Sequence, residues 1–153
     1  MSPSDEDPYA PTDAELRSIL GDARTIAVVG LSSKPDRYSH EVAVFLQGRG
    51  YRIVPVNPNE TEVLGEPAYP SLLDVPEEVS IDVVDVFRRA EETPEIARQA
   101  VARRAKVLWL QDGIVSDEAR RLAEDAGLAV IMGLCIKRTS TRLGQRAETD
   151  GEG

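Results

Sequence analysis

Short apolar runs alternate with segments of helical periodicity along most of this chain. Each run is nearly continuously apolar and is bounded by glycine or polar residues, which is typical of strands buried on both faces of a parallel sheet. The runs cover residues 25–29, 52–56, 81–87, 107–110 and 128–132. We therefore predict five parallel interior strands.

The segments between these strands carry signals for helix ends. Thr12 and Glu15 have the spacing of a capping box, at the start of a short amphipathic helix that ends at Gly21. Thr93 and Pro94 predict a further helix, with Thr93 as its cap and the proline at the first helical position. Two more helices are expected, over residues 39–47 and from Ser116 to Gly127.

Strands that alternate with helices imply right-handed βαβ units, so we expect an α/β three-layer sandwich with a mainly parallel sheet. The proline-rich stretch from 57 to 80 predicts a short edge strand at residues 68–69 and one helical turn at residues 72–73. The length of 153 residues suits one domain. We expect that domain at residues 12–143, between mobile acidic tails at residues 1–11 and 144–153.

The net charge of −9 is concentrated near the two ends of the chain. Residues 1–15 hold five acids and no base, and residues 145–153 hold three acids and one base, so the body is close to neutral. A local anion site in the body is therefore compatible with the overall acidity. We expect no nucleic-acid partner, because no basic stripe with interleaved aromatic residues is present.

Several classes of protein are excluded by what the sequence lacks. One cysteine, Cys135, cannot make an internal disulfide or a multi-thiolate zinc site, and one histidine, His40, cannot supply a His-rich metal site. No apolar run reaches the roughly 18–20 residues that span a bilayer, and no signal sequence is evident. We expect a cytoplasmic protein with no membrane partner and no metal. No catalytic residue is assigned, which favours a binding role over an enzymatic one.

The loop after the first predicted strand has the composition of a phosphate site. Gly30 allows a sharp turn, and the free N–H groups of the following helix start favour an anion. Hydroxyl groups and positive charges follow within ten residues, from Ser32, Ser33, Lys34, Arg37 and Ser39. The alternative interpretation is an ordinary strand-to-helix turn, rich in glycine and serine, whose two bases are merely solvated.

The glycine pattern argues against the commonest dinucleotide ligands. A nicotinamide or flavin dinucleotide usually requires G-x-G-x-x-G and an acid at the end of the second strand. Here only Gly30 is present, and the second strand ends in Val56 and Asn57. No phosphate-loop motif of the G-x-x-x-x-G-K-[ST] type exists. An adenine nucleotide with an extra phosphate fits Lys34 and Arg37 better than NAD does.

Several segments recur in the order seen in a known family. They are Val28 to Arg37 with Ser39, Pro55 to Asn59, Val63 to Gly65, Tyr69 to Leu72, Val83 to Arg88, Ala105 to Gln111, and Cys135 to Lys137. With these segments the chain resembles the stand-alone bacterial and archaeal CoA-binding proteins over about residues 20–138. That family is similar to the CoA-binding domain of the succinyl-CoA synthetase alpha subunit.

The resemblance implies a Rossmann-like sheet of order 3-2-1-4-5-6, with residues 68–69 as the edge strand. It also implies a bound coenzyme A or acyl-CoA. Backbone N–H groups of residues 30–33 would hold the diphosphate, Lys34 and Arg37 the phosphates including the 3′-phosphate, and two turns the adenosine. The implied cofactor-binding residues are Gly30, Leu31, Ser32, Ser33, Lys34, Arg37, Ser39, Val56, Asn57, Pro58, Phe87, Arg88, Gln111 and Cys135.

Two departures limit what the resemblance carries over. The family usually has Asp-Arg or Asn-Arg before the cysteine, where this chain has Gly133 and Leu134, and often ends the motif with Glu-His, where this chain has Thr139 and Ser140. No catalytic role follows from that segment. Two alternatives to a CoA-binding protein stay open: a degenerate NAD(P)-binding oxidoreductase, and an accessory subunit of an acyl-CoA ligase or transferase, whose protein partner the sequence does not name.

Two further residues have competing interpretations. Cys135 is either a packed, inert thiol or close enough to a bound thiol to form a mixed disulfide. Asp85 lies within a strand that is expected to be buried, and its carboxylate is expected either to accept a hydrogen bond from a structural backbone N–H group or to hydrogen-bond a loop backbone near the site.

Overall fold

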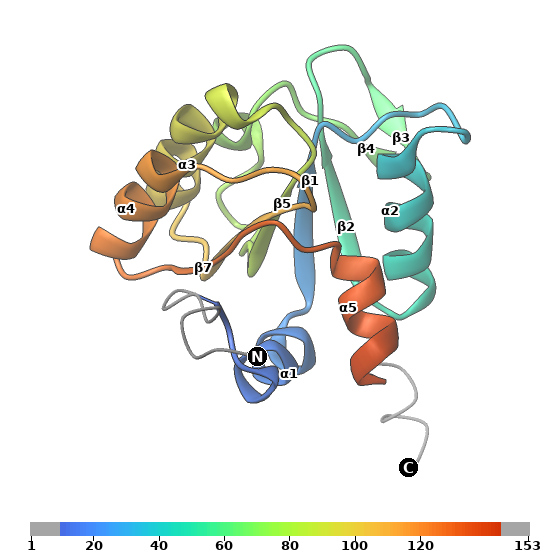
Figure 1. The fold of residues 1–153 in the computed structure, drawn as a ribbon. Helices are drawn as coiled ribbons and strands as arrows, with labels where there is room; N and C mark the ends of the chain where they lie inside the picture. Colours follow the sequence, from blue (N-terminus) through green and yellow to red (C-terminus); the bar gives the residue numbers. More distant parts are fainter. Residues whose placement is uncertain (1–9, 145–153) are drawn as a thin grey trace.

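A five-stranded parallel sheet forms the centre of the computed structural model, which describes residues 10–144 (Figure 1). The strands are β1 (Thr25–Val29), β2 (Arg52–Val56), β5 (Val83–Val86), β6 (Val107–Leu110) and β7 (Ala129–Ile131), in the order β2-β1-β5-β6-β7. This is the order expected of a Rossmann-like fold, and the fold prediction is confirmed. The expected edge strand is reduced to one parallel bridge between Val56 and Tyr69.

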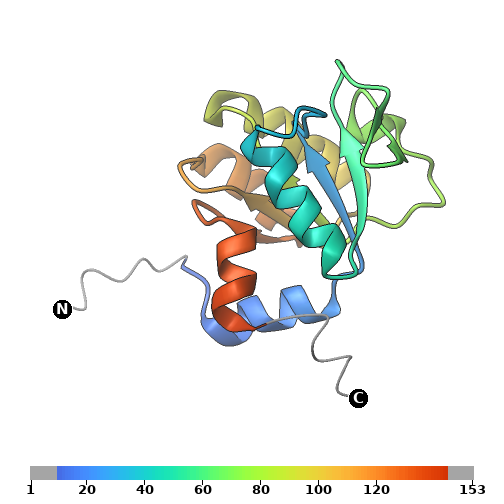
Figure 2. The same ribbon diagram turned by 90° about the vertical axis from the view of Figure 1, so that its right-hand side faces the viewer.

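Helices cover both faces of the sheet, as the three-layer prediction requires. Those on one face are α3 (Thr93–Ala102) and α4 (Asp117–Asp125), and those on the other are α1 (Asp13–Asp22), α2 (Tyr38–Gly48) and α5 (Ile136–Leu143). Figure 2 shows α2 lying in front of β1 and β2, with α5 and α1 below it. A small hairpin of β3 (Glu62–Val63) and β4 (Glu66–Pro67) follows β2, and short 3-10 turns lie at η2 (Leu72–Asp74) and η3 (Ala90–Glu92).

The interior strands are apolar because both of their faces are covered. All five residues of β1 and all four of β5 and of β6 are buried. Trp109 of β6 is fully buried, and its indole N–H donates to the carbonyl of Leu134 at 2.9 Å. The tryptophan therefore contributes to the core and also fixes the backbone that leads into α5.

Two of the three predicted helix caps are confirmed. The Thr12 and Glu15 side chains exchange hydrogen bonds with each other's backbone N–H groups, and the Ser116 hydroxyl accepts from the Ala119 N–H at 3.1 Å. The prediction for Thr93 is wrong. Because η3 runs directly into α3, Glu92 takes the cap position, and the Thr93 hydroxyl donates to the Ala90 carbonyl at 2.6 Å.

The irregular connection between β2 and β5 is held by one side chain. The Arg103 guanidinium, at the end of α3, donates to four backbone carbonyls at 2.7–3.1 Å, those of Leu72, Val75, Pro76 and Val79. These carbonyls belong to a stretch with no strand partner, so the arginine supplies the hydrogen bonds that a sheet would otherwise provide.

Between residues 10 and 144 no helix is both long and apolar enough to cross a bilayer. The same part of the chain contains no cluster of three or more His, Cys, Asp or Glu side chains that could hold a metal ion. The expected mobile tails fall mainly on residues 1–9 and 145–153, which lie outside the described residues.

Candidate functional site

The carboxyl ends of β1 and β5 approach each other closely at Gly30. This residue has a φ of +93°, and a Cβ atom there would lie 2.7 Å from the Phe87 carbonyl oxygen and 3.0 Å from Arg88 Cδ. Only glycine accepts both that dihedral angle and that contact. The loop after β1 can therefore cross the end of β5, where ligands of such sheets bind.

Most backbone donors of the loop after β1 already have acceptors. The Gly30 N–H donates to the Val56 carbonyl at 2.8 Å, and the Ser32 N–H to Ser39 Oγ at 3.1 Å. The Ser33 N–H donates to a carboxylate oxygen of Glu60 at 2.9 Å. Glu60 thus sets a negatively charged oxygen against a backbone N–H group, as a phosphate would. Sequence reasoning did not single out Glu60, which lies far along the chain.

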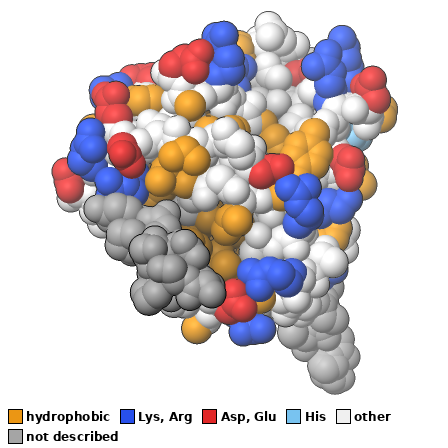
Figure 3. All heavy atoms as spheres, viewed as in Figure 1, with side chains coloured by type: hydrophobic (Ala, Val, Ile, Leu, Met, Phe, Trp, Pro, Cys, Tyr) orange, Lys and Arg blue, Asp and Glu red, His pale blue; other side chains and the backbone are white. Residues whose placement is uncertain are grey.

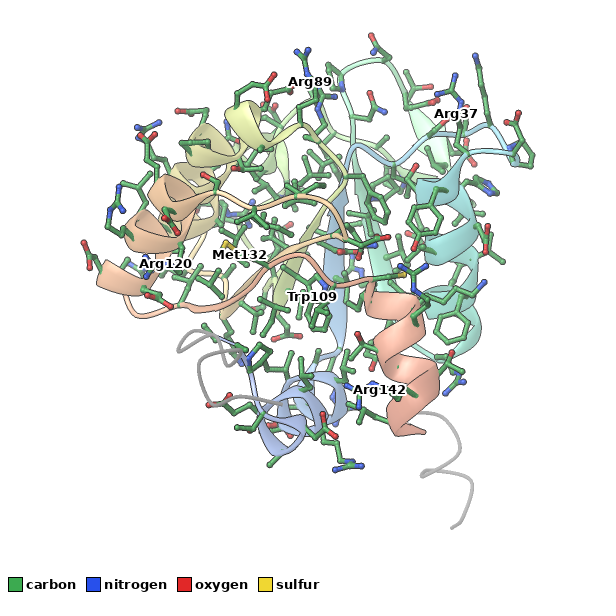
Figure 4. The ribbon with its side chains drawn as sticks, viewed as in Figure 1. Arg37, Arg89, Trp109, Arg120, Met132 and Arg142 are labelled. Carbon is green, nitrogen blue, oxygen red and sulfur yellow. The ribbon has the colours of Figure 1, made fainter. Side chains whose placement is uncertain are left out.

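Positive potential gathers at the start of α2. The helix begins at Tyr38 without a capping side chain, so its first-turn N–H groups face the loop. Lys34 and Arg37 are exposed, and neither forms an ion pair within residues 10–144. Figure 4 shows Arg37, in the loop after β1, and Arg89, in the segment after β5, at the same edge of the sheet. On the face seen in Figure 3, basic and acidic side chains are interspersed, without a continuous basic stripe.

Asn57 joins the loop after β2 to the loop after β1. Its side-chain amide donates to the Leu31 carbonyl at 3.0 Å, and its oxygen accepts from the Asn59 N–H at 2.9 Å. Val56 and Leu31 are buried below this contact, and Pro58 is exposed above it. These four predicted residues are therefore brought together.

A cavity of about 190 Å³ lies between these loops and α3. Its wall includes Gly30, Val56, Pro58, Pro70, Arg88 and Ile96. Its volume corresponds to roughly six water molecules, which is room for a small planar group. Four of the predicted residues line it, and both prolines and Ile96 present apolar surface.

Arg88 reaches this cavity already paired with a carboxylate. Its Nε and Nη2 atoms lie 2.8 and 2.6 Å from the same Glu92 oxygen, and Arg89 Nε lies 3.1 Å from the other oxygen. The hydrogen bond from Arg88 holds the pKa of Glu92 below its usual range. Phe87, the residue before Arg88, packs edge-on against the Tyr38 ring, with 5.9 Å between ring centres.

A second group of polar side chains is buried beneath this edge, on the face covered by α2 and α5. Gln111 accepts from the Ile136 N–H at 3.1 Å, while its side-chain nitrogen has no partner in the described part of the chain. Cys135 is buried, and the Tyr38 hydroxyl lies 2.6 Å from its sulfur. Arg138 approaches that hydroxyl at 3.3 Å and pairs with Asp112 at 2.7 Å.

The prediction that Asp85 accepts a backbone hydrogen bond is wrong. The side chain is fully buried, and neither carboxylate oxygen has a hydrogen-bond partner among the described residues. Burial, with smaller contributions from nearby Cys135 and Asp112, raises the pKa of Asp85 well above its usual range. The N–H groups of its own strand are used by the sheet, so the carboxyl group is left inside the layer beside α5.

The predicted residues fall into two groups: the open edge around Gly30 and the buried layer around Cys135. Lys34 and Arg37 belong to the open edge through the backbone hydrogen bonds of the loop after β1, and both residues are exposed. Sequence reasoning missed Tyr38, although it lies between the predicted Arg37 and Ser39, and it missed Glu60 and Glu92 because only the fold brings them to this edge.

Comparisons with known proteins agree on one family. Residues 24–141 match the family described as CoA binding domain. The uncharacterised protein YneT of Bacillus subtilis is 46% identical over 127 residues, which is 83% of this chain and 93% of YneT. A solved structure of a hypothetical protein from Pyrococcus horikoshii is 39% identical, with a TM-score of 0.86, and the match covers 92% of this chain and 97% of that one.

One more distant relative belongs to a larger protein. An ADP-forming acetate–CoA ligase II from Archaeoglobus fulgidus is 29% identical over 103 residues, which is 66% of this chain but only 15% of the ligase. The similarity is therefore to one part of that protein.

Proposed function

This chain belongs to the CoA-binding domain family, and on that premise we propose that it binds coenzyme A, or an acyl-CoA, at the carboxyl edge of its sheet. The observation that carries the proposal is the close packing of Gly30 against the end of β5, which brings the loop after β1 and the uncapped start of α2 to the carboxyl edge of the sheet. The chemistry at this edge is cationic and rich in donors, as a nucleotide with several phosphates requires.

The diphosphate lies against the start of α2. The Tyr38 and Ser39 N–H groups at the start of this helix, which have no acceptor within residues 10–144, donate to it. The hydroxyl groups of Ser32 and Ser33 lie in the same loop. Because Glu60 already occupies the Ser33 N–H, the ligand either leaves that hydrogen bond intact or displaces the carboxylate.

Lys34 and Arg37 hold the outer phosphates, including the 3′-phosphate. Both side chains are exposed and unpaired in the described residues, so neither must give up a salt bridge when an anion arrives. Charge-assisted hydrogen bonds to phosphate are about twice as strong as neutral ones.

The adenine ring of the adenosine occupies the cavity between the loops after β1 and β2. Pro58, Pro70 and Ile96 supply apolar surface, and Arg88 supplies a planar cation at the wall. The pantetheine arm would extend along the same edge towards α5. On that path it would pass Phe87 and then the buried Gln111 and Cys135.

We assign the protein a binding or accessory role in the cytoplasm, in which it holds the cofactor or presents it to an acyl-CoA ligase or transferase. The groups at the edge are glycine, hydroxyls and cations, which bind phosphates without making or breaking bonds.

Calorimetric titration tests this proposal with four ligands: coenzyme A, dephospho-CoA, acetyl-CoA and NADP. We expect coenzyme A to bind about tenfold more tightly than dephospho-CoA, a difference that corresponds to one charge-assisted contact. The double variant Lys34→Ala, Arg37→Ala should remove that preference. Matched controls are Arg17→Ala and Arg52→Ala, which change exposed bases away from this edge.

Binding of NADP without binding of coenzyme A would replace this proposal with the degenerate oxidoreductase. An unchanged preference for coenzyme A over dephospho-CoA in the double variant would refute the phosphate assignment alone.

A further inference from the structure

Cys135 is held in place from both sides by side chains of the central sheet. The residue before it is fixed by Trp109, whose indole N–H donates to the Leu134 carbonyl. The residue after it is fixed by Gln111, whose oxygen accepts from the Ile136 N–H. Figure 4 shows Trp109 beside α5, at the centre of this face. These two contacts fix the backbone on either side of Cys135 and so define where its sulfur atom lies.

Among the described residues, Tyr38 is the only one whose side chain forms a hydrogen bond with the sulfur of Cys135. Its hydroxyl lies 2.6 Å from Sγ, while the residue is 38% exposed and its ring packs against Phe87 at the proposed ligand edge. Tyr38 therefore contacts both the buried thiol and that edge. Access of a ligand to the sulfur requires this side chain to move.

Unpartnered polar groups lie in the same buried layer. Side chains alternate along β5, so Asp85 faces the same side of the sheet as Val83, which packs in one cluster with Trp109 and Cys135. Both Asp85 oxygens and the Gln111 nitrogen have no hydrogen-bond partner in the described chain. Natural cores leave few such groups unsatisfied, and each one calls for a role beyond packing.

Positive charge lies close to Cys135. The residue is the N-cap of α5 and has no side-chain hydrogen bond of its own to that helix, so the positive helix end faces it. Arg138 donates to the Tyr38 hydroxyl, which in turn donates to the sulfur, so two hydrogen bonds separate the guanidinium charge from the sulfur atom.

We propose that Cys135 is a modification site that exchanges with the disulfide form of the bound cofactor. This inference rests on the proposed function, because the nucleotide must first bring the disulfide to the edge. The Cys135 thiolate attacks one sulfur of CoA disulfide, a new S–S bond forms to that sulfur, and the old S–S bond breaks. One coenzyme A leaves as a thiolate and takes up the proton that Cys135 gave to solvent. A free thiol reverses the reaction.

The experiment incubates the full chain with CoA disulfide and follows its intact mass. We expect one adduct whose mass is that of coenzyme A less two hydrogens, reversed by dithiothreitol and absent from Cys135→Ser. Glutathione disulfide is the matched reagent without a nucleotide. It should react at least about tenfold more slowly, because a bound disulfide has a high effective concentration at the thiol.

Tyr38→Phe tests the geometry, since it keeps the ring and removes the hydroxyl. We expect the rate of exchange with CoA disulfide to fall several-fold while the affinity for reduced coenzyme A stays unchanged, because the hydroxyl contacts the sulfur atom. A purely structural role for the hydroxyl would change the melting temperature but leave the exchange rate unchanged.

Two outcomes would overturn the proposal while leaving the proposed function intact. In the first, the wild type binds reduced coenzyme A in the presence of reductant but forms no adduct with CoA disulfide. In the second, glutathione disulfide reacts as fast as CoA disulfide, so that the thiol has only general reactivity. Failure of reduced coenzyme A to bind the wild type would instead refute the proposed function.

Discussion

Two aspartates three residues apart mark the difference between the two edges of the sheet. At the amino edge, Asp82 accepts from the backbone N–H groups of Arg24 and Thr25, both at 2.9 Å, and Lys106 lies 3.4 Å away. Burial raises the pKa of Asp82, but these N–H groups and Lys106 outweigh it and hold the pKa below its usual range. Further along, the buried Asp85 has no hydrogen-bond partner among the described residues, and its pKa is raised.

The contrast shows that the polar groups of the two edges serve different purposes. At the amino edge they form hydrogen bonds with the protein's own backbone. At the carboxyl edge Lys34 and Arg37 have no ion pair in the described residues, and the buried carboxyl group of Asp85 beneath that edge has no hydrogen-bond partner there. A hollow of about 510 Å³ at the amino edge is larger than the cavity beside Gly30, yet its Asp82 and Arg103 are both occupied by backbone groups. The presence of polar groups without partners, rather than the volume of a hollow, therefore identifies the candidate site.

Alanine at Gly30 should have the largest effect. The new Cβ would meet the Phe87 carbonyl at 2.7 Å at a φ that alanine rarely adopts, so we expect a loss of roughly 2–5 kcal/mol in unfolding free energy and loss of CoA binding. Gly50, at the amino edge, is the matched control: its φ is +96° and nothing lies within 4 Å, so Gly50→Ala should cost about 1–2 kcal/mol. Equal losses in urea unfolding would mean that the close approach at Gly30 is unimportant.

Alanine at Asp82 should affect stability alone. Two backbone donors lose a charged acceptor, and we expect about 2–3 kcal/mol of destabilisation with unchanged CoA affinity. Because the pKa of Asp82 is lower in the folded state, its contribution is present above the unfolded pKa and is lost as the pH falls through the folded pKa. Lys106→Ala is the control and should change stability by no more than about 0.5 kcal/mol. Weakened CoA binding in the Asp82 variant would contradict the division between the edges.

Asparagine at Asp85 should have the opposite dependence on pH. A raised folded pKa means that the wild type is favoured at low pH and loses stability as the pH rises above the unfolded pKa towards the folded one. Asp85→Asn cannot ionise, so it should be more stable than the wild type at alkaline pH, by on the order of 1 kcal/mol. Thermal melts at several pH values measure this difference. Parallel pH profiles for the two proteins would show that Asp85 does have a partner.

Glutamine at Glu92 should have the smallest effect, and it should act on affinity. Glu92 competes with the ligand for Arg88, so Glu92→Gln should raise CoA affinity about two- to fivefold, as expected for a partly exposed ion pair. Glu95→Gln is the control, because Glu95 pairs with Arg98 on the same helix but outside the cavity. A weaker affinity in the Glu92 variant would mean that the pair orients Arg88 for the ligand instead.

The strands could be predicted closely because burial on both faces leaves a strong local pattern. The predicted bounds of β1, β2 and β6 agree with the structure residue for residue, whereas those of β5 and β7 extend beyond the hydrogen-bonded ladder because the apolar pattern continues past it. Helix α5 was not predicted. Its sequence is mainly polar and β-branched, and it is fixed from outside by Gln111 and by an ion pair of Arg142 with Asp13 at 3.2 Å.

The candidate site residues that could be named from the sequence lie at the ends of predicted strands or directly after them. Gly30 to Ser39 form one continuous loop and helix start, so their chemistry was visible in the sequence. Glu60 and Glu92 reach the same edge through the hairpin and η3, and no periodicity reports such contacts. That Asp85 has no hydrogen-bond partner among the described residues could not be predicted either, since it depends on how α5 packs against the sheet.

The four carbonyl contacts of Arg103 have a consequence for how the chain responds to proteases. Although the segment from 72 to 79 is largely irregular, its backbone is fastened to α3 and should resist nicking under native conditions. Replacement of that one arginine would turn the segment into a cleavage point, and digestion there would separate β1 and β2 from the rest of the sheet's strands in a single cut.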